Sequence, residues 1–249
     1  GSDKAIAYLN THCYADSLSQ KDFLVDSGVS SSKRISVLGS GSLAGIDLKR
    51  FNPLIFNLED KKELRAELGV SLTTQVLLFV GRLSRDKGIV ELIQAFEKLM
   101  VNEPDACLVL LGPSEIDVGA LLDNFAGAIK GRVIMPGVTS EPERFMAIAD
   151  MLVLPSYREG FGTVVVEAAA MGIPTIGTNI YGLSDAIVDG KTGLLVPVGD
   201  VDKLTEAITY LLKNNVLRCE MGANARRRVE DQFSDELLNE LMLKEYEHF

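Results

Sequence analysis

The sequence predicts an α/β protein in which a parallel sheet of six strands carries helices on both of its faces. Between residues 75 and 196, short runs that are apolar throughout recur, and such runs are typical of buried parallel strands. Longer stretches with helical spacing separate these runs, which is the order of elements that builds a parallel sheet. The 249 residues are 47% hydrophobic and 24% charged, as expected for a globular protein with a sizeable core.

The elements can be assigned in chain order. Strands are expected at 75–81, 106–112, 132–135, 151–154, 174–178 and 193–196. Helices are expected at 60–68, 88–102, about 121–125, 141–149, 163–171, 201–213, 216–231 and 235–247. Before residue 59 the pattern is weaker, and we expect only a helix over 16–28 and a short strand over 34–38.

Residues 39–45 are small and flexible, and Phe51-Asn52-Pro53 ends this stretch. Two interpretations stay open: a linker between domains, which is the commoner role for such a composition, or a loop that faces a cleft. Gly1 and Ser2 are typical of a cloning remnant, and the missing initiator Met suggests that the chain begins partway through a longer protein.

Charge limits the possible ligands. The formal net charge is −10, which repels nucleic-acid backbones and anionic lipid, so we expect no nucleic-acid partner and no direct membrane contact. Any phosphate ligand must therefore meet a local cluster of positive groups. The consecutive Arg226, Arg227 and Arg228 are expected to be solvated near a helix end. The three scattered cysteines suggest reduced thiols in a cytosol, and no apolar run approaches the roughly 20 residues of a membrane span.

The most informative stretch follows the strand expected at 151–154. Pro155 stops that strand because it has no N–H for the ladder, and Gly160 and Gly162 permit a tight turn. A helix then begins at Thr163. A strand, a glycine loop and a helix N-terminus in this order direct free backbone N–H groups to one spot, where an anion can bind.

Two carboxylates bracket this spot, Glu159 in the loop and Glu167 two turns into the helix. From its apolar neighbours alone, Glu167 would be a buried glutamate in need of a partner.

Ligands of such folds bind outside the carboxyl ends of the strands, so the loops after the strands should share one rim. The loop after the first strand contains Arg82 and Lys87, a forked guanidinium and a flexible ammonium that suit a diphosphate. A lone charged side chain at the surface is most often merely solvated, and we assign that role to Arg85 and Asp86 of the same loop. The loop is neither a Walker A loop nor a G-x-G-x-x-G turn.

Taken together, these motifs resemble the retaining nucleotide-sugar glycosyltransferases of family 4. Gly81-Arg82-Leu83 with Lys87-Gly88, and Pro155-Ser156 with Glu159-Gly160-Phe161-Gly162, stand in the family's order, and the spacing of Glu159 and Glu167 matches its E-x7-E motif. Residues 37–53 resemble the segment in which the family's chain crosses between its two domains. The resemblance covers most of residues 33–232.

The resemblance implies the GT-B fold, in which two Rossmann-like domains face each other across a cleft. Residues 1–2 aside, residues 3–52 would be the end of the N-terminal domain and the crossing segment. Residues 53–232 would be the Rossmann-like, C-terminal domain that binds the donor, and residues 233–249 a C-terminal helix. The chain would then be an excised half that binds nucleotide but transfers little sugar alone, because catalysis needs both walls of the cleft.

The resemblance also implies roles for the charged residues. Arg82 and Lys87, which follow Gly81, would bind the diphosphate and stabilise charge on the departing nucleotide, with no metal or other cofactor. Glu159 would lie near the donor sugar and complete the catalytic set. Glu167 would accept hydrogen bonds from the ribose hydroxyls.

Backbone groups would hold the rest of the donor. The N–H groups of Gly160, Phe161, Gly162 and Thr163 would meet the phosphate, and Pro136-Gly137-Val138 would lie against the base. A UDP-sugar is the expected donor, and the acceptor would be a glycan or lipid-linked molecule bound through the missing N-terminal domain. The location would be the cytoplasm, with the whole protein at the inner face of the membrane.

One motif departs from the family, because Tyr181-Gly182-Leu183-Ser184-Asp185 stands where Gly-Gly-x-x-Glu is usual. Two alternatives remain. A non-catalytic nucleotide-binding or interaction domain with the same fold would not need Arg82, Lys87, Glu159 and Glu167 together. A sugar-nucleotide epimerase or a phosphorylase would lack the E-x7-E helix.

Overall fold

In the computed structural model, residues 2–101, 103, 105–125 and 127–247 are described. The main sheet has six parallel strands in the order β5-β4-β3-β6-β7-β8, which confirms the expected strand number and direction. Their bounds are β3 Gln75–Val80, β4 Ala106–Leu111, β5 Val133–Gly137, β6 Met151–Leu154, β7 Thr175–Thr178 and β8 Gly193–Val196. Strands β4 and β5 follow β3 in order on one side of it. Strand β6 lies on the other side of β3, and β7 and β8 follow it in order.

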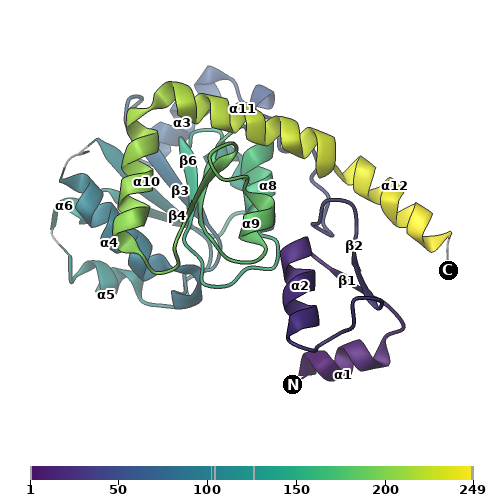
Figure 1. Ribbon diagram of the computed structural model, residues 1–249. Coiled ribbons are helices and arrows are strands. Elements are labelled where there is room, and N and C mark those ends of the chain that lie inside the picture. The colour runs from purple at the N-terminus through teal and green to yellow at the C-terminus, as the bar shows by residue number, and fades with distance from the viewer. Residues whose placement is uncertain (1, 102, 104, 126, 248–249) are drawn as a thin grey trace.

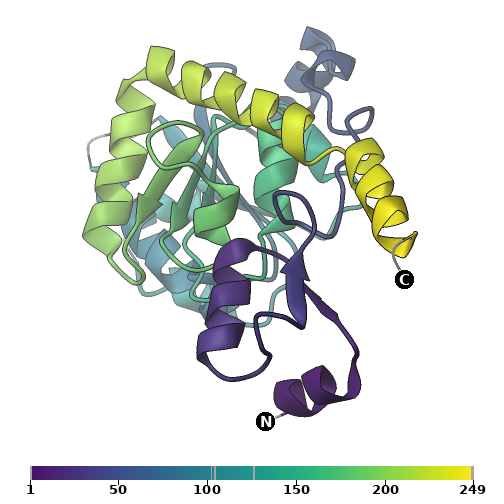
Figure 2. The same ribbon diagram turned by 45° about the vertical axis from the view of Figure 1, so that its right-hand side comes forward.

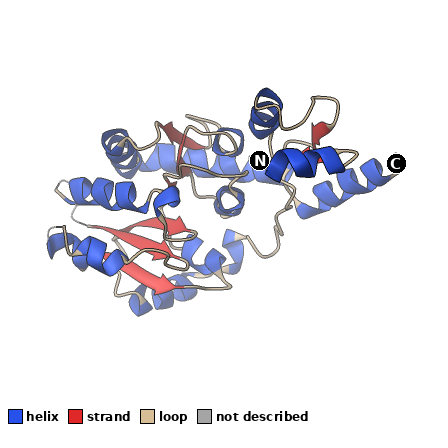
Figure 3. Cartoon of the chain, turned by 90° about the horizontal axis from the view of Figure 1, so that it is seen from below, coloured by secondary structure: helices blue, strands red, loops and turns tan. Residues whose placement is uncertain are grey.

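Helices cover the sheet, so that it forms the middle of the domain (Figure 1, Figure 3). Helix α4 packs against α10, and α8 packs against α7 and α11. The helices of this domain are α3 Leu58–Glu67, α4 Ile89–Met100, α5 Val118–Leu122, α6 Gly127–Lys130, α7 Pro142–Met146, α8 Thr163–Ala170, α9 Leu183–Ala186, α10 Val201–Lys213 and α11 Asn215–Gln232, with short 3-10 turns η1 Pro53–Ile55 and η2 Arg85–Lys87.

The burial pattern explains why the apolar runs predict this sheet. Every residue of β4 and of β6 is buried, as are the four central residues of β3. A strand covered by helices on both faces has no solvent side, so its sequence is apolar without alternation. Each fully buried leucine, valine or phenylalanine of these strands stabilises the fold by about 1.5–3 kcal/mol through the hydrophobic effect.

Some boundaries differ from the sequence prediction. The helix expected at about 121–125 is α5, which begins earlier and ends at Leu122; α6 follows it and was not predicted, and α7 is shorter than the predicted 141–149. The predicted end of α4 at Asn102 lies outside the described residues, as do Gly1 and residues 248–249 of the predicted C-terminal helix. Helices α1 Ser2–Leu9 and α9 and strand β1 Cys13–Ala15 were not predicted, since each is short and has little periodicity.

The N-terminal part forms a small unit beside the main domain (Figure 2). Strand β1 pairs in parallel with β2 Ile35–Val37, and α2 Leu18–Asp26 lies between them in the chain. The C-terminal helix α12 Asp235–Tyr246 extends to this unit, where Tyr14 donates a hydrogen bond of 2.7 Å to Glu245. A backbone hydrogen bond of 2.9 Å from Ile46 N to Phe233 O joins the segment that follows β2 to the segment between α11 and α12.

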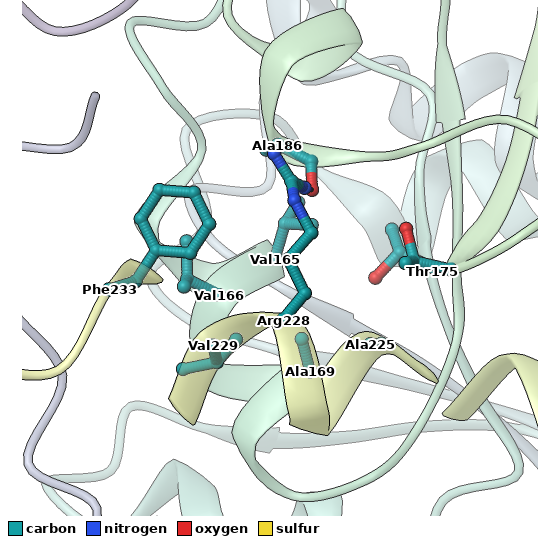
Figure 4. Close-up of a pocket in the computed structure, with 10 residues that line it drawn as sticks. Val165, Val166, Ala169, Thr175, Ala186, Ala225, Arg228, Val229 and Phe233 are labelled. Atoms are coloured by element: carbon teal, nitrogen blue, oxygen red, sulfur yellow. Dashed lines mark hydrogen bonds between the residues drawn. The ribbon is translucent and has the colours of Figure 1, made fainter. Parts of the chain in front are cut away.

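The expectation that Arg226, Arg227 and Arg228 are all solvated is wrong. Arg228 projects from α11 past Phe233 toward Ala186 (Figure 4), and its guanidinium donates to the carbonyl oxygens of Asp185 and Ala186 at 2.6 Å each. Arg226 donates to the carbonyl oxygen of Ala170 at 2.6 Å. The carbonyl groups at the ends of α8 and α9 need donors, and these arginines supply them.

Gly88 allows the loops after β3 and β6 to touch. Its φ of 71° is in the left-handed region, and a Cβ on this residue would overlap the carbonyl oxygen of Pro155. Tyr157 N donates to Asp86 O across the same contact at 2.8 Å. The two loops therefore meet through their backbones.

We expect Gly88→Ala to destabilise the protein more than Gly69→Ala. Both glycines have positive φ, and alanine costs about 1–2 kcal/mol there. Only Gly88 is crowded, since nothing lies within 4 Å of a Cβ at Gly69. Urea unfolding should show an extra loss of at least about 1 kcal/mol for Gly88→Ala. Equal losses would contradict the close contact between the loops.

Candidate functional site

The site lies where the strand order reverses. Strands β4 and β5 lie to one side of β3, and β7 and β8 lie to the other side of β6. The chain thus continues from β3 toward one side of the sheet and from β6 toward the other, and a crevice lies outside the carboxyl ends of these two strands, which is where open α/β sheets bind ligands. A third loop, which follows β7, is in close contact with the loop after β6, since a Cβ at Gly182 would overlap the carbonyl oxygen of Gly160.

Lys87 and Glu159 join the first two loops. Their Nζ and Oε1 atoms are 2.7 Å apart, and only 16% and 12% of the two side chains are exposed. Ser156, which is fully buried, donates a second hydrogen bond of 2.8 Å to the same carboxylate oxygen. Because the pair is shielded from water, it interacts more strongly than a surface ion pair, and it fixes both side chains at the rim.

Arg82 lies at the same rim but is more open, with 49% of its side chain exposed. Its guanidinium binds both carboxylate oxygens of Glu115 at 2.7 and 2.8 Å and Asp86 at 3.1 Å. A hydrogen bond from Ser84 and the charge of Arg82 lower the pKa of Asp86, so this partner stays ionised. Assigning Asp86 a merely solvated role was therefore wrong.

Two hollows open at this rim. The first, of about 410 Å³, is lined by Gln20, Arg82, Asp86, Lys87, Arg158, Glu159, Gly160 and Tyr181. The second, of about 420 Å³, is lined by Asp16, Ser42, Leu43, Ala44, Glu159, Gly160, Phe161, Gly162 and Thr163. Glu159 and Gly160 line both hollows, which are therefore adjacent and together can hold an extended ligand.

The N-terminus of α8 faces the second hollow through Thr163. Its N-cap residue, Gly162, has no side chain to bond the first amides, and no acidic residue occupies the first turn. The positive end of the helix is thus not compensated by the helix itself, which favours an anion at this place. The phenyl ring of Phe161 is buried against Phe233, so Phe161 can offer a ligand only its backbone.

Glu167 is mostly buried, and its carboxylate makes no hydrogen bond within the described part of the chain. Burial raises the pKa of Glu167, the charge of Arg50 opposes this shift, and the charge of Glu143 adds to it. Arg50 in turn binds both carboxylate oxygens of Glu143, at 3.0 and 2.8 Å, and the carbonyl oxygen of Ser140. Glu167 therefore has acceptor capacity that its surroundings leave unused.

The structure brings most, but not all, of the predicted residues together. Arg82, Lys87, Glu159, Gly160, Phe161, Gly162 and Thr163 line the two hollows. Gly81, Val138 and Glu167 line neither of them. Val138 directly follows β5 and is 74% exposed, on the side of β3 away from β6.

Sequence analysis missed the residues that come from the N-terminal part. Asp16 and Gln20 flank or lie in α2, and Ser42 to Ala44 belong to the small, flexible stretch. This position favours a loop that faces a cleft over a linker. The helix over 16–28 was expected, but no local pattern shows that it packs against residues more than 150 positions away.

The part of the chain that the structure describes lacks two features. No group of three or more histidine, cysteine, aspartate or glutamate side chains there is arranged to hold a metal ion. In the same part of the chain, no helix has the length and apolarity that a membrane crossing requires.

Comparison with known proteins identifies the family of the chain. The family model for glycosyl transferases group 1 matches residues 60–228. CapM, a capsular polysaccharide biosynthesis glycosyltransferase of Staphylococcus aureus, is 32% identical over an alignment of 250 positions, which covers 99% of this chain and 64% of CapM. The N-acetyl-alpha-D-glucosaminyl L-malate synthase of Bacillus anthracis is 34% identical over 73% of this chain and 48% of that enzyme. The chain thus spans less than two thirds of either relative.

Solved structures agree on the fold. HepE of Anabaena, crystallised in complex with UDP and glucose, superposes with a TM-score of 0.85 at 20% identity, over 98% of this chain and 64% of HepE. Sucrose-phosphate synthase of Thermosynechococcus elongatus gives 0.84 at 28% identity, over 99% of this chain and 60% of that one. These likenesses confirm the expected C-terminal half of a GT-B fold.

We expect Glu167→Gln to stabilise the protein at neutral pH. The raised pKa means that the folded state favours the protonated carboxyl, so the charged form costs stability above that pKa. Glutamine removes this cost. The gain should be present at pH 7 and shrink as the pH falls toward about 4.3, the ordinary pKa of a glutamate, where the unfolded chain is protonated too.

Thermal unfolding of both proteins over this pH range measures the effect. Glu220→Gln, on the exposed side of α11, serves as the control and should show no such pH-dependent gain. A Glu167→Gln variant that is less stable than the wild type at pH 7 would contradict the assignment of Glu167 as an unpartnered buried carboxylate.

Proposed function

The chain belongs to the group 1 glycosyl transferases, and from this premise we propose that it is the donor-binding half of a retaining enzyme. The enzyme would move a sugar from a nucleotide diphosphate sugar, a UDP-sugar in our proposal, to a glycan or lipid-linked acceptor. The acceptor would bind to an N-terminal domain beyond this chain. We place the reaction in the cytoplasm, with the whole protein at the inner face of the membrane.

One observation carries the proposal. The shielded Lys87–Glu159 pair sits at the strand reversal, between Arg82 on one loop and the glycine turn before α8 on the other. Two cations, backbone amides and a helix N-terminus suit a diphosphate, while the carboxylate suits sugar hydroxyls. A surface that served only as a protein interaction site would not need this set of groups.

The same groups can assist departure of the nucleotide. Negative charge develops on the diphosphate when the bond to the sugar breaks, and fixed cations stabilise that charge without reorganising. Lys87 keeps a donor for a phosphate oxygen while it binds Glu159, because an ammonium has three N–H groups. Arg82 would exchange one carboxylate partner for the phosphate. We therefore propose that no metal ion is required.

The choice of uridine rests on the relatives. HepE was crystallised with UDP and with UDP-glucose. CapM and the putative teichuronic acid glycosyltransferase TuaC of Bacillus subtilis, which is 34% identical over 81% of this chain, are named for surface polymers. The share of these relatives that the chain spans supports a binding half that transfers little by itself.

Calorimetry with UDP, GDP and ADP tests the proposal. We expect one of them, UDP, to bind with a dissociation constant between micromolar and millimolar, or about −4 to −8 kcal/mol. Lys87→Gln, which retains a hydrogen-bond donor for Glu159 but loses the charge, should weaken UDP binding at least about tenfold. Arg82→Ala should weaken it about three- to tenfold, because this cation is exposed and already paired.

Lys98→Ala is the matched control, since Lys98 forms an exposed pair with Asp202 on another surface. It should leave UDP binding unchanged, as should replacement of Mg²⁺ by EDTA in the buffer. Wild-type affinity in both the Lys87→Gln and Arg82→Ala proteins would remove the diphosphate assignment, and loss of binding in EDTA would remove the metal-independent mechanism.

A further inference from the structure

Hydrogen bonds of Ser19 attach helix α2, in the N-terminal part, to Gly182 and Asp185 of the loop after β7, and we call this contact the clasp. Ser19 Oγ donates to the carboxylate of Asp185, and Ser19 N lies 3.3 Å from the same oxygen. Gly182 N donates back to Ser19 Oγ at 3.0 Å. Figures 1 and 2 both show α2 beside α9, which begins in this loop. One serine thus bonds both a backbone amide and a side chain of the loop.

A ring contact reinforces the clasp. Phe23 of α2 stacks on Tyr181, with ring centroids 4.9 Å apart and planes inclined by 17°. Stacked aromatic pairs of this kind stabilise a contact beyond the apolar area that they bury. Tyr181 and Asp185 are the two residues at which the sequence departs from the usual Gly-Gly-x-x-Glu, so the departure coincides with the α2 contact.

Gln20 is held in a defined orientation at this place. Its backbone N–H bonds the N-cap Ser17 Oγ at 3.1 Å, and its side-chain Oε1 accepts the N–H of Asp16 at 2.7 Å. The side-chain NH₂ group is left with two N–H donors, and none of the described residues accepts a hydrogen bond from it. Gln20 lines the same hollow as Arg82 and Lys87.

We propose that Gln20 is a further ligand of the donor, whose side-chain NH₂ donates to the β-phosphate, and that Ser19 and Asp185 position it. The inference rests on the proposed function. The β-phosphate is the end of the nucleotide nearest the sugar, and Glu159, assigned to the sugar, lines the hollow that contains Gln20. A neutral amide adds a hydrogen bond to an anionic oxygen without adding to the charge of the site.

Binding of UDP and of UMP, which lacks the β-phosphate, tests this assignment by calorimetry. Gln20→Ala should weaken UDP binding about three- to tenfold and leave UMP binding within about twofold of the wild type. Gln20→Glu should weaken UDP binding further, because a carboxylate would face the β-phosphate. Gln94→Glu adds the same charge on the exposed face of α4 and should change neither affinity.

Two outcomes would overturn the inference while leaving the proposed function intact. Wild-type UDP affinity in Gln20→Ala and Gln20→Glu would show that Gln20 does not reach the diphosphate, and equal losses for UDP and UMP would place it elsewhere on the nucleotide. Failure of the wild-type chain to bind either nucleotide would instead refute the proposed function, and the inference with it.

The positioning role has its own test. Ser19→Ala should weaken UDP binding without affecting UMP, and its effect should largely disappear in a Gln20→Ala background because Ser19 acts through Gln20. Ser19→Thr, which retains the hydroxyl, should restore most of the affinity. Additive losses in the double variant would contradict positioning.

Discussion

The reversal of strand order between β3 and β6 determines where this protein can bind a ligand. Adjacent parallel strands end at the same edge, and only at the reversal do their following loops diverge and leave a crevice. Gly88 then lets the loop after β3 touch the loop after β6, and Gly182 lets the loop after β7 touch it too, so the walls of the crevice are held by backbone contacts. These backbone contacts bring the charged side chains together, and the ion pairs Lys87–Glu159 and Arg82–Glu115 then hold them in place.

The balance of charge in the site follows from the composition of the chain. A protein with a net charge of −10 binds an anion only if its cations gather locally, and here two of the cations at the rim are paired with carboxylates: Lys87 with Glu159, and Arg82 with Glu115 and Asp86. Such pairing satisfies the charges and keeps the side chains in place. A diphosphate would join or replace these partners, so its affinity would be lower than isolated cations would provide.

Much of the fold and part of the candidate site were predictable from local sequence. The central strands β3, β4 and β6 are almost entirely apolar because they are buried on both faces, and the glycine loop with Glu159 and the following helix with Glu167 are recognisable from residue types and spacing alone. The pairing of Arg82 with Glu115, the cap that Arg228 places on α9, and the hydrogen bond of Ser19 to Asp185 were not, since they join residues 33 to 166 positions apart. Long-range contacts between polar residues leave no periodicity in the sequence, whereas burial of a whole strand does.

A crystal structure of the chain with bound UDP is the most direct test of the central claim, that one crevice at the strand reversal holds the diphosphate. We expect a phosphate oxygen within about 3 Å of Lys87 Nζ, with the neighbouring phosphate at the backbone amides of the first turn of α8. UDP bound at another edge of the sheet, or in this crevice without contact to Lys87 or the glycine loop, would contradict it.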